Sequence, residues 1–122
     1  MKKIKDKKNS LGDGIYLKNN KWSFSGDASK NFDKHIIRSV PLYLEGHKMI
    51  EDLSRYTLSK KSLCYDIGCS TGTLLNKLAK INKNARFIGI DKEKDMIKIA
   101  NTKKKFKNIS YICNDIMKYR MK

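Results

Sequence analysis

The chain has 122 residues, which is enough for one domain with a modest core and too few for two. Hydrophobic residues make up 39% and charged residues 33%, as expected for a soluble globular protein with a highly charged surface. No apolar run approaches the roughly 20 residues needed to cross a bilayer, and no apolar stretch follows the basic N-terminus as it would in a secretion signal. We therefore expect no membrane segment and a cytoplasmic protein.

The net charge of +16 raises the question of nucleic-acid binding. Only four of the 28 basic residues are arginine, the residue that most often makes bidentate contacts to bases and phosphates. The lysines are spread over every segment of the chain. This pattern predicts weak, non-specific attraction to RNA and does not indicate a dedicated binding surface.

The three cysteines, Cys64, Cys69 and Cys113, form no C-x-x-C pair, and neither His35 nor His47 lies at a metal-binding spacing. A disulfide framework and a structural zinc site, which needs four closely spaced ligands, are both disfavoured. We expect no bound metal.

The N-terminal third begins with residues 1–20, where lysine, asparagine and glycine without periodicity predict a mobile basic leader. Trp22 and Phe24 follow as apolar anchors of a domain expected over residues 21–122. A short helix is predicted around residues 32–38, ending near Val40 because Pro41 disfavours helix for the residue before it. Apolar residues at helical spacing predict a second helix over residues 42–57.

From residue 62 onward the chain alternates between short apolar segments and amphipathic ones. Strands are predicted over residues 62–65, 86–90 and 109–113. Helices are predicted over residues 73–81 and around residues 96–100, trailing into a run of lysines. This β-α-β-α-β order predicts an α/β, Rossmann-like domain with a parallel sheet and right-handed crossovers.

A glycine-containing motif, Asp66-x-Gly68-x-Ser70-x-Gly72, falls between the first of these strands and the helix after it. Glycines at such a turn let the backbone approach a ligand and adopt dihedrals closed to other residues. The acidic start separates the motif from the dinucleotide pattern Gly-x-Gly-x-x-Gly, and it places a carboxylate where a positively charged ligand group would lie.

Two further acids follow the other strands: Asp91 ends the second, and Asp115, in Asn114-Asp115-Ile116, follows the third. Open α/β sheets bind ligands at the carboxyl ends of their strands, and an acid about 20 residues beyond the glycine turn accepts hydrogen bonds from ribose hydroxyls. Asp115 would accept from an exocyclic amine, with Ile116 flanking a ring. The alternative is that each acid only caps the helix that follows it. Cys69, at a helix N-terminus, has no histidine placed as a partner, so we interpret it as a small loop residue.

With these residues in view, the chain resembles class I S-adenosylmethionine-dependent methyltransferases, and more narrowly the carboxy-S-adenosyl-L-methionine synthase family. The resemblance runs from Trp22 to about Ile116. Its most specific part is the segment Arg38-Ser39-Val40-Pro41-Leu42-Tyr43, ahead of Tyr65-Asp66-Ile67-Gly68-Cys69-Ser70; it continues through Ile88-Gly89-Ile90-Asp91 and Met96-Ile97.

The resemblance implies a set of cofactor contacts for S-adenosylmethionine or its carboxylated form. In the family's pattern these fall on Tyr43, Gly68, Cys69, Ser70, Asp91, Lys92, Asp115 and Ile116, and the loop motif adds Asp66 and Gly72. The family converts S-adenosylmethionine and prephenate to carboxy-S-adenosylmethionine, which is used to modify the wobble uridine of tRNA. No catalytic residue can be assigned from the sequence.

The sequence covers only the N-terminal half of such a fold, because it stops at Lys122, just after the third predicted strand. We therefore expect either that the chain is a fragment of a longer protein, or that the strand at residues 62–65 forms an exposed apolar edge that favours self-association. Methyl and carboxymethyl chemistry both remain open. So do two other hypotheses: a non-catalytic S-adenosylmethionine-binding or interaction module, and a basic RNA-associating protein.

Overall fold

The computed structural model describes residues 16–18, 21–23 and 27–121. Two short strands, β1 (Tyr16–Lys18) and β2 (Lys21–Ser23), pair antiparallel. The boundary expected at residue 20, between a basic leader and the domain, stays a prediction. Residues 1–15, 19–20 and Phe24 lie outside the described residues.

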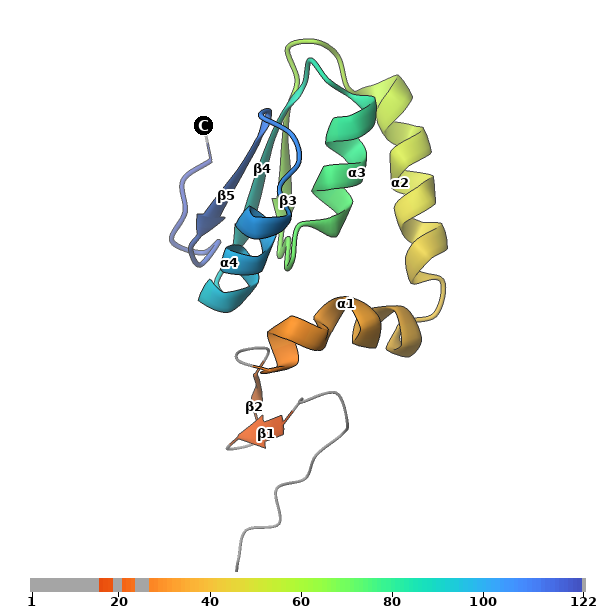
Figure 1. Cartoon of the computed structure of the whole chain (residues 1–122). Coiled ribbons are helices and arrows are strands. Elements are labelled where there is room, and N and C mark those ends of the chain that lie inside the picture. Colours follow the sequence, from red (N-terminus) through yellow and green to blue (C-terminus); the bar gives the residue numbers. More distant parts are fainter. Residues whose placement is uncertain (1–15, 19–20, 24–26, 122) are drawn as a thin grey trace, which may run out of the picture.

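Two helices follow the hairpin, α1 (Asp27–Ser39) and α2 (Tyr43–Thr57). Between them Leu42 adopts a left-handed backbone conformation with φ of 58°, directly after Pro41. Figure 1 shows α1 lying across one end of the sheet, while α2 runs alongside α3. The helix expected at residues 32–38 is thus longer at its N-terminus, where polar residues give no apolar periodicity.

The larger sheet consists of β3 (Leu63–Ile67), β4 (Arg86–Asp91) and β5 (Ile109–Cys113), all parallel and in the order β3-β4-β5. Helices α3 (Thr73–Ile81) and α4 (Lys94–Lys103) connect the strands. Because the strand order runs in one direction, right-handed crossovers place both helices against the same face of the sheet. The predicted β-α-β-α-β order is confirmed.

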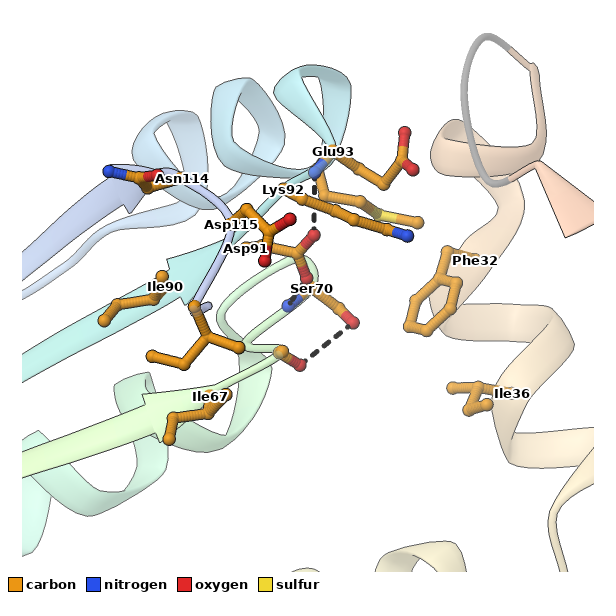
Figure 2. Close-up of a pocket in the computed structure, with 13 residues that line it drawn as sticks. Phe32, Ile36, Ile67, Ser70, Ile90, Asp91, Lys92, Glu93, Asn114 and Asp115 are labelled. Atoms are coloured by element: carbon orange, nitrogen blue, oxygen red, sulfur yellow. Dashed lines mark hydrogen bonds between the residues drawn. The ribbon is translucent and has the colours of Figure 1, made fainter. Parts of the chain in front are cut away.

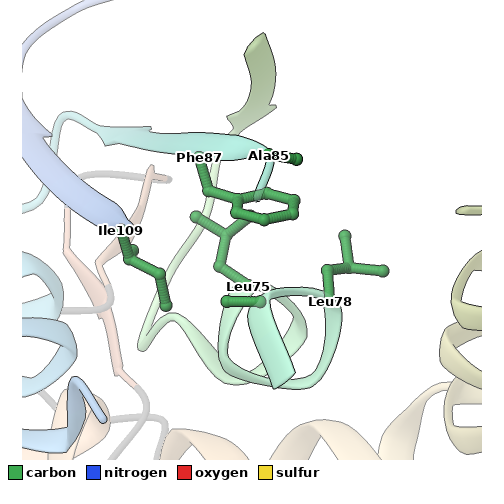
Figure 3. Packing of buried hydrophobic residues seen from close by; sticks show 6 residues of the cluster. Leu75, Leu78, Ala85, Phe87 and Ile109 are labelled. Atoms are coloured by element: carbon green, nitrogen blue, oxygen red, sulfur yellow. The ribbon is translucent and has the colours of Figure 1, made fainter. Parts of the chain in front are cut away.

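The hydrophobic core lies between α3 and the sheet, and Figure 3 shows its packing. Leu75 and Leu78 of α3 pack against Phe87 of β4 and Ile109 of β5, each 4% exposed or less. Burying a side chain of this size contributes about 1.5–3 kcal/mol. This packing fixes the sheet beneath the helices, and with it the positions of the three strand ends.

Candidate functional site

The candidate site lies at the carboxyl ends of β3, β4 and β5, where a cavity of about 590 Å³ opens between these strand ends and α1. Figure 2 shows Phe32 and Ile36 of α1 facing Asp91 and Ser70 across this space. The lining residues come from α1, the glycine loop, the end of β4 and the start of α4, and the segment after β5: Phe32, Ile36, Ile67, Gly68, Ser70, Ile90, Asp91, Lys92, Glu93, Met96, Asn114, Asp115 and Ile116.

The loop between β3 and α3 is fixed by its backbone. Gly68, Ser70 and Gly72 all have positive φ, at 76°, 49° and 73°. The amides of Gly68 and Cys69 both donate to the carbonyl of Ile90, at 2.8 and 3.1 Å. A left-handed φ is free of steric cost only for glycine, so the two glycines allow the loop to fold back onto β4.

The carboxylate of Asp91 binds this loop directly. Its Oδ2 accepts a hydrogen bond from the amide of Ser70 at 2.9 Å, and its Oδ1 accepts one from the amide of Glu93 at 2.9 Å. An ionised carboxylate offers about four lone-pair sites, so roughly two remain for a ligand. Asp91 therefore both caps the start of the next helical segment and orders the glycine loop.

A second cavity, of about 240 Å³, adjoins the first and shares Phe32, Ile36, Gly68 and Ser70 with it. Asp66 and Tyr43 both line it, together with Gly68, Cys69 and Ser70. Burial, and then the charge of Asp91, raise the pKa of Asp66 above its usual value. Burial also raises the pKa of Tyr43, with smaller contributions from Asp33 and Asp66. A cationic ligand group near Asp66 would offset the cost of its burial.

The side chain of Cys69 is buried against β4. Its residue is 6% exposed, and its Sγ lies 2.8 Å from the position that a Cβ on Gly89 would occupy. Burial, with the charges of Asp66 and Asp91, raises its pKa to about 12, so the thiol is protonated at neutral pH. The thiolate is the nucleophilic form of cysteine, so we assign Cys69 no nucleophilic role.

Gly72 differs from the other loop residues because it is not part of the lining of either cavity. It precedes α3, and its carbonyl accepts a hydrogen bond from the hydroxyl of Tyr111 at 3.3 Å. Its place in the motif is explained by this close packing against β5.

The segment after β5 brings Asp115 and Ile116 to the rim of the larger cavity, together with Lys92. The Oδ1 atom of Asp115 accepts a hydrogen bond from the amide of Met117 at 3.0 Å, so this acid caps a turn. Local capping and ligand binding are compatible at both Asp91 and Asp115, because one or two backbone amides do not saturate a carboxylate.

Sequence reasoning missed several residues of this site. Phe32 and Ile36 form the wall opposite the strand ends. Their spacing of four residues, which puts both side chains on one face of a helix, is the sequence feature that could have identified them. His47 lines the smaller cavity beside Tyr43, with their ring centroids 4.3 Å apart. Among the described residues, its Nδ1 is the buried side-chain polar atom that has no hydrogen-bond partner.

The described residues include no group of three or more His, Cys, Asp or Glu side chains able to hold a metal ion. Nor does any described helix have the length and apolar character that a membrane crossing requires.

The strand order, the glycine loop and the acids at the strand ends define the nucleotide-binding half of a class I methyltransferase fold. Residues 58–122 match the family model described as a methyltransferase domain, and the chain belongs to this family. Among solved structures, it is similar to the N-methyltransferase NodS from Bradyrhizobium japonicum WM9 in complex with S-adenosyl-L-homocysteine, with a TM-score of 0.56 and 28% identity over 68% of this chain and 41% of that one. The predicted fold is confirmed.

Curated relatives that match the chain carry the name carboxy-S-adenosyl-L-methionine synthase. The protein from Helicobacter hepaticus is 40% identical over 105 residues, which cover 80% of this chain and 44% of the relative. The protein from Staphylococcus epidermidis is 35% identical over 101 residues, covering 81% of this chain and 44% of the relative. The resemblance seen in the sequence is confirmed, and the chain spans less than half the length of these relatives.

Proposed function

We propose that this domain binds S-adenosylmethionine across the carboxyl ends of β3, β4 and β5. The observation that carries this proposal is the hydrogen bond from the Ser70 amide to Asp91, because it brings the glycine loop and an acidic strand end to the rim of one cavity. The cavity volume of about 590 Å³ falls within the range of roughly 300–1,000 Å³ typical of small-molecule sites. The S-adenosyl-L-homocysteine bound to NodS is in keeping with this proposal.

The chemistry of the lining residues suits each part of this cofactor. Asp91 would accept hydrogen bonds from the ribose hydroxyls through its remaining lone pairs. Asp66, in the smaller cavity beside Tyr43, would pair with the ammonium group of the methionine portion. Gly68, Cys69 and Ser70 would contact the cofactor through the loop backbone. Lys92, Asp115 and Ile116 would form the adenine side, where Asp115 accepts from the exocyclic amine.

The activity we propose is that of the curated relatives, the synthesis of carboxy-S-adenosyl-L-methionine. The cofactor, when bound, supplies a methyl group activated by a sulfonium. The residues of this chain would orient it, with Asp66 at its ammonium group, Asp91 at its ribose and α1 excluding water. The resemblance to the synthase family extends the proposal to prephenate as co-substrate, to a role in tRNA wobble-uridine modification and to a cytoplasmic location.

Isothermal titration calorimetry with S-adenosylmethionine and with S-adenosyl-L-homocysteine tests the binding proposal. We expect a one-to-one complex with each, and far weaker binding of adenosine or methionine alone because each fills one part of the site. Absence of binding by the folded chain would overturn it. Mass spectrometry of reactions with and without prephenate then tests the activity, through the appearance of carboxy-S-adenosylmethionine.

The second candidate is a non-catalytic S-adenosylmethionine-binding or interaction module. Calorimetric binding without product in any reaction would support this candidate over the synthase.

The edge strand β3 suggests self-association as a further property. Within the described sheet β3 pairs with β4 alone, and Ile67 at its carboxyl end is 53% exposed. Unpaired strand edges of this kind pair readily with another chain. Light scattering is expected to detect a dimer or larger species, and a monodisperse monomer would contradict the proposal. The net charge adds weak, salt-sensitive attraction to nucleic acid.

A further inference from the structure

One carboxylate joins three segments that are far apart in the sequence. Asp33 of α1 accepts hydrogen bonds through Oδ1 from the hydroxyls of Thr71 and Thr73, the latter at 3.3 Å. Its Oδ2 pairs with the ammonium of Lys103, at the end of α4. That ammonium also lies 3.1 Å from Oγ1 of Thr73 and 3.4 Å from Oγ1 of Thr71. We call these four residues the Asp33 network.

The Asp33 network contacts the glycine loop at its C-terminal end, where α3 begins. Thr71 and Thr73 stand on either side of Gly72, and Thr71 is 2% exposed. A shift of Asp33 would break the hydrogen bond that the buried Thr71 hydroxyl donates to it, which carries a free-energy cost. The carboxylate of Asp33 therefore binds Thr71, the neighbour in the same loop of Ser70, whose amide binds Asp91.

The helix that bears Asp33 also carries the apolar wall of the site. Phe32, its immediate neighbour, and Ile36, one turn later, are only partly buried and wall both cavities. Ile37 is 47% exposed, and Val40, just past the helix, is 42% exposed. The polar contacts of Asp33 therefore join the part of α1 that walls both cavities to the glycine loop and to α4.

The electrostatics of Asp33 agree with this geometry. Burial by itself would raise its pKa, but hydrogen bonds from Lys103, Thr71 and Thr73, together with the charge of Lys103, outweigh burial and lower the pKa. The carboxylate is thus ionised at neutral pH. The side chains of Lys103 and Asp33 are 35% and 39% exposed, so the pair is open to screening by salt.

We propose that Asp33 is a positioning residue of the cofactor site, which holds Phe32 and Ile36 of α1 over the bound ligand through Lys103, Thr71 and Thr73. The network thereby sets how fast the ligand leaves. The identity of the ligand rests on the proposed function, whereas the attachment of α1 does not.

The test compares Asp33→Asn with Asp52→Asn. The control variant removes the ion pair between Lys48 and Asp52, 2.6 Å long and exposed on α2, away from both cavities. For S-adenosyl-L-homocysteine, we expect Asp33→Asn to dissociate on the order of tenfold faster than the unchanged chain, and Asp52→Asn at the same rate as the unchanged chain. Equal dissociation rates for Asp33→Asn and the unchanged chain would overturn the proposal.

Lys103 supplies a second pair of variants if Asp33→Asn fails to fold. Lys103→Gln should speed dissociation, and Lys103→Arg, which keeps the charge, should restore most of the slow rate. A purely structural role would lower the thermal midpoint without this charge-dependent rescue. Dissociation from the unchanged chain should also speed up between 0.1 and 1 M salt, where the Debye length falls from about 10 to about 3 Å.

Hydrogen exchange without ligand separates this proposal from the proposed function. The amides of residues 27–39 should exchange faster in Asp33→Asn than in Asp52→Asn. If the unchanged chain binds no S-adenosyl-L-homocysteine but this difference appears, the function fails and the positioning role stands. If the ligand binds and neither exchange nor dissociation responds to Asp33→Asn, the positioning role fails alone.

Discussion

Gly72 and Tyr111 are packed so closely that no side chain fits between them. The hydroxyl of Tyr111 donates to the carbonyl of Gly72 at 3.3 Å, and a Cβ built on Gly72 would lie 2.1 Å from that hydroxyl. Gly72 also has a φ of 73°. Two features therefore require glycine at position 72: its left-handed backbone conformation and the close approach of the Tyr111 side chain.

Gly72→Ala should therefore destabilise the protein. The left-handed backbone costs an alanine roughly 1 kcal/mol, and forced overpacking typically adds 1–3 kcal/mol. Gly46→Ala is the matched control, since Gly46 lies inside α2 with nothing within 4 Å of a built Cβ; it should stabilise the helix by about 0.5–1 kcal/mol. Chemical denaturation measures both. Equal effects of the two substitutions would contradict this account.

Asp66 should show opposite effects on stability and binding. Its pKa is raised by burial and by the charge of Asp91, so the folded state binds its proton more tightly than the unfolded state does. Stability then falls as pH rises from the unfolded value of 3.8 through the folded pKa, and at pH 7 the ionised group opposes folding.

Asp66→Asn should accordingly raise the unfolding midpoint of the ligand-free chain at pH 7, and this gain should vanish below pH 3.8. The same substitution removes a charged partner of the ligand, so affinity for S-adenosyl-L-homocysteine should drop by about 10- to 150-fold, equivalent to 1.5–3 kcal/mol. Thermal unfolding and calorimetry provide the two readouts. A loss of stability at pH 7 would show that Asp66 is satisfied in the free protein.

Asp91→Ala should weaken cofactor binding by a similar factor, about 10- to 150-fold, because it removes charged hydrogen bonds worth roughly 1.5–3 kcal/mol. Asp91→Asn keeps one carbonyl acceptor for the amide of Ser70 and should lose less. Asp95→Ala, on the first turn of α4 and outside both cavities, is the control. Affinity unchanged in Asp91→Ala would rule out its assignment to the ribose.

Much of the Rossmann pattern could be predicted because local signals agree. The predicted bounds of α3 and β5 match the structure. The glycine turn and the leucines at helical spacing predict α3, and a short apolar run predicts β5. β3 continues two residues further than predicted, to Ile67, because the parallel ladder with β4 extends to Ile90. Such pairing depends on the partner strand and leaves no mark in the sequence of β3.

The contacts that assemble the site are the part that sequence could not supply. Asp33 reads as an ordinary surface acid on a helix, and Lys103 as one of a run of lysines. Their pairing joins residues 70 positions apart and arises only when α1 crosses the end of the sheet. The conformation of the glycine loop, by contrast, depends on glycines that are visible in the sequence. The motif therefore predicted where the site lies.

His47 should make the protein less stable at acidic pH. Burial and the charge of Lys77 lower its pKa, partly offset by Glu51, and Lys77 and Glu51 themselves pair at 3.5 Å. The unfolded chain therefore takes up a proton below the ordinary value of 6.5 while the folded chain does not. Stability is full above pH 6.5 and is lost as pH falls toward the folded pKa, by at most about 1.4 kcal/mol per pH unit.

His47→Leu should flatten the dependence of stability on pH between 7.5 and 5.5, because it removes the titrating group and the buried Nδ1 that lacks a partner. His35→Leu, which changes the other histidine of the chain, on α1, is the matched control and should leave most of the slope in place. Urea denaturation at a series of pH values measures the slopes. If the slope of stability against pH were unchanged in His47→Leu and lost in His35→Leu, the group responsible for the acid sensitivity would be His35 on α1 and not His47. If the slope is lost in His47→Leu and retained in His35→Leu, the proton-sensitive group is His47, next to Tyr43 in the wall of the smaller cavity.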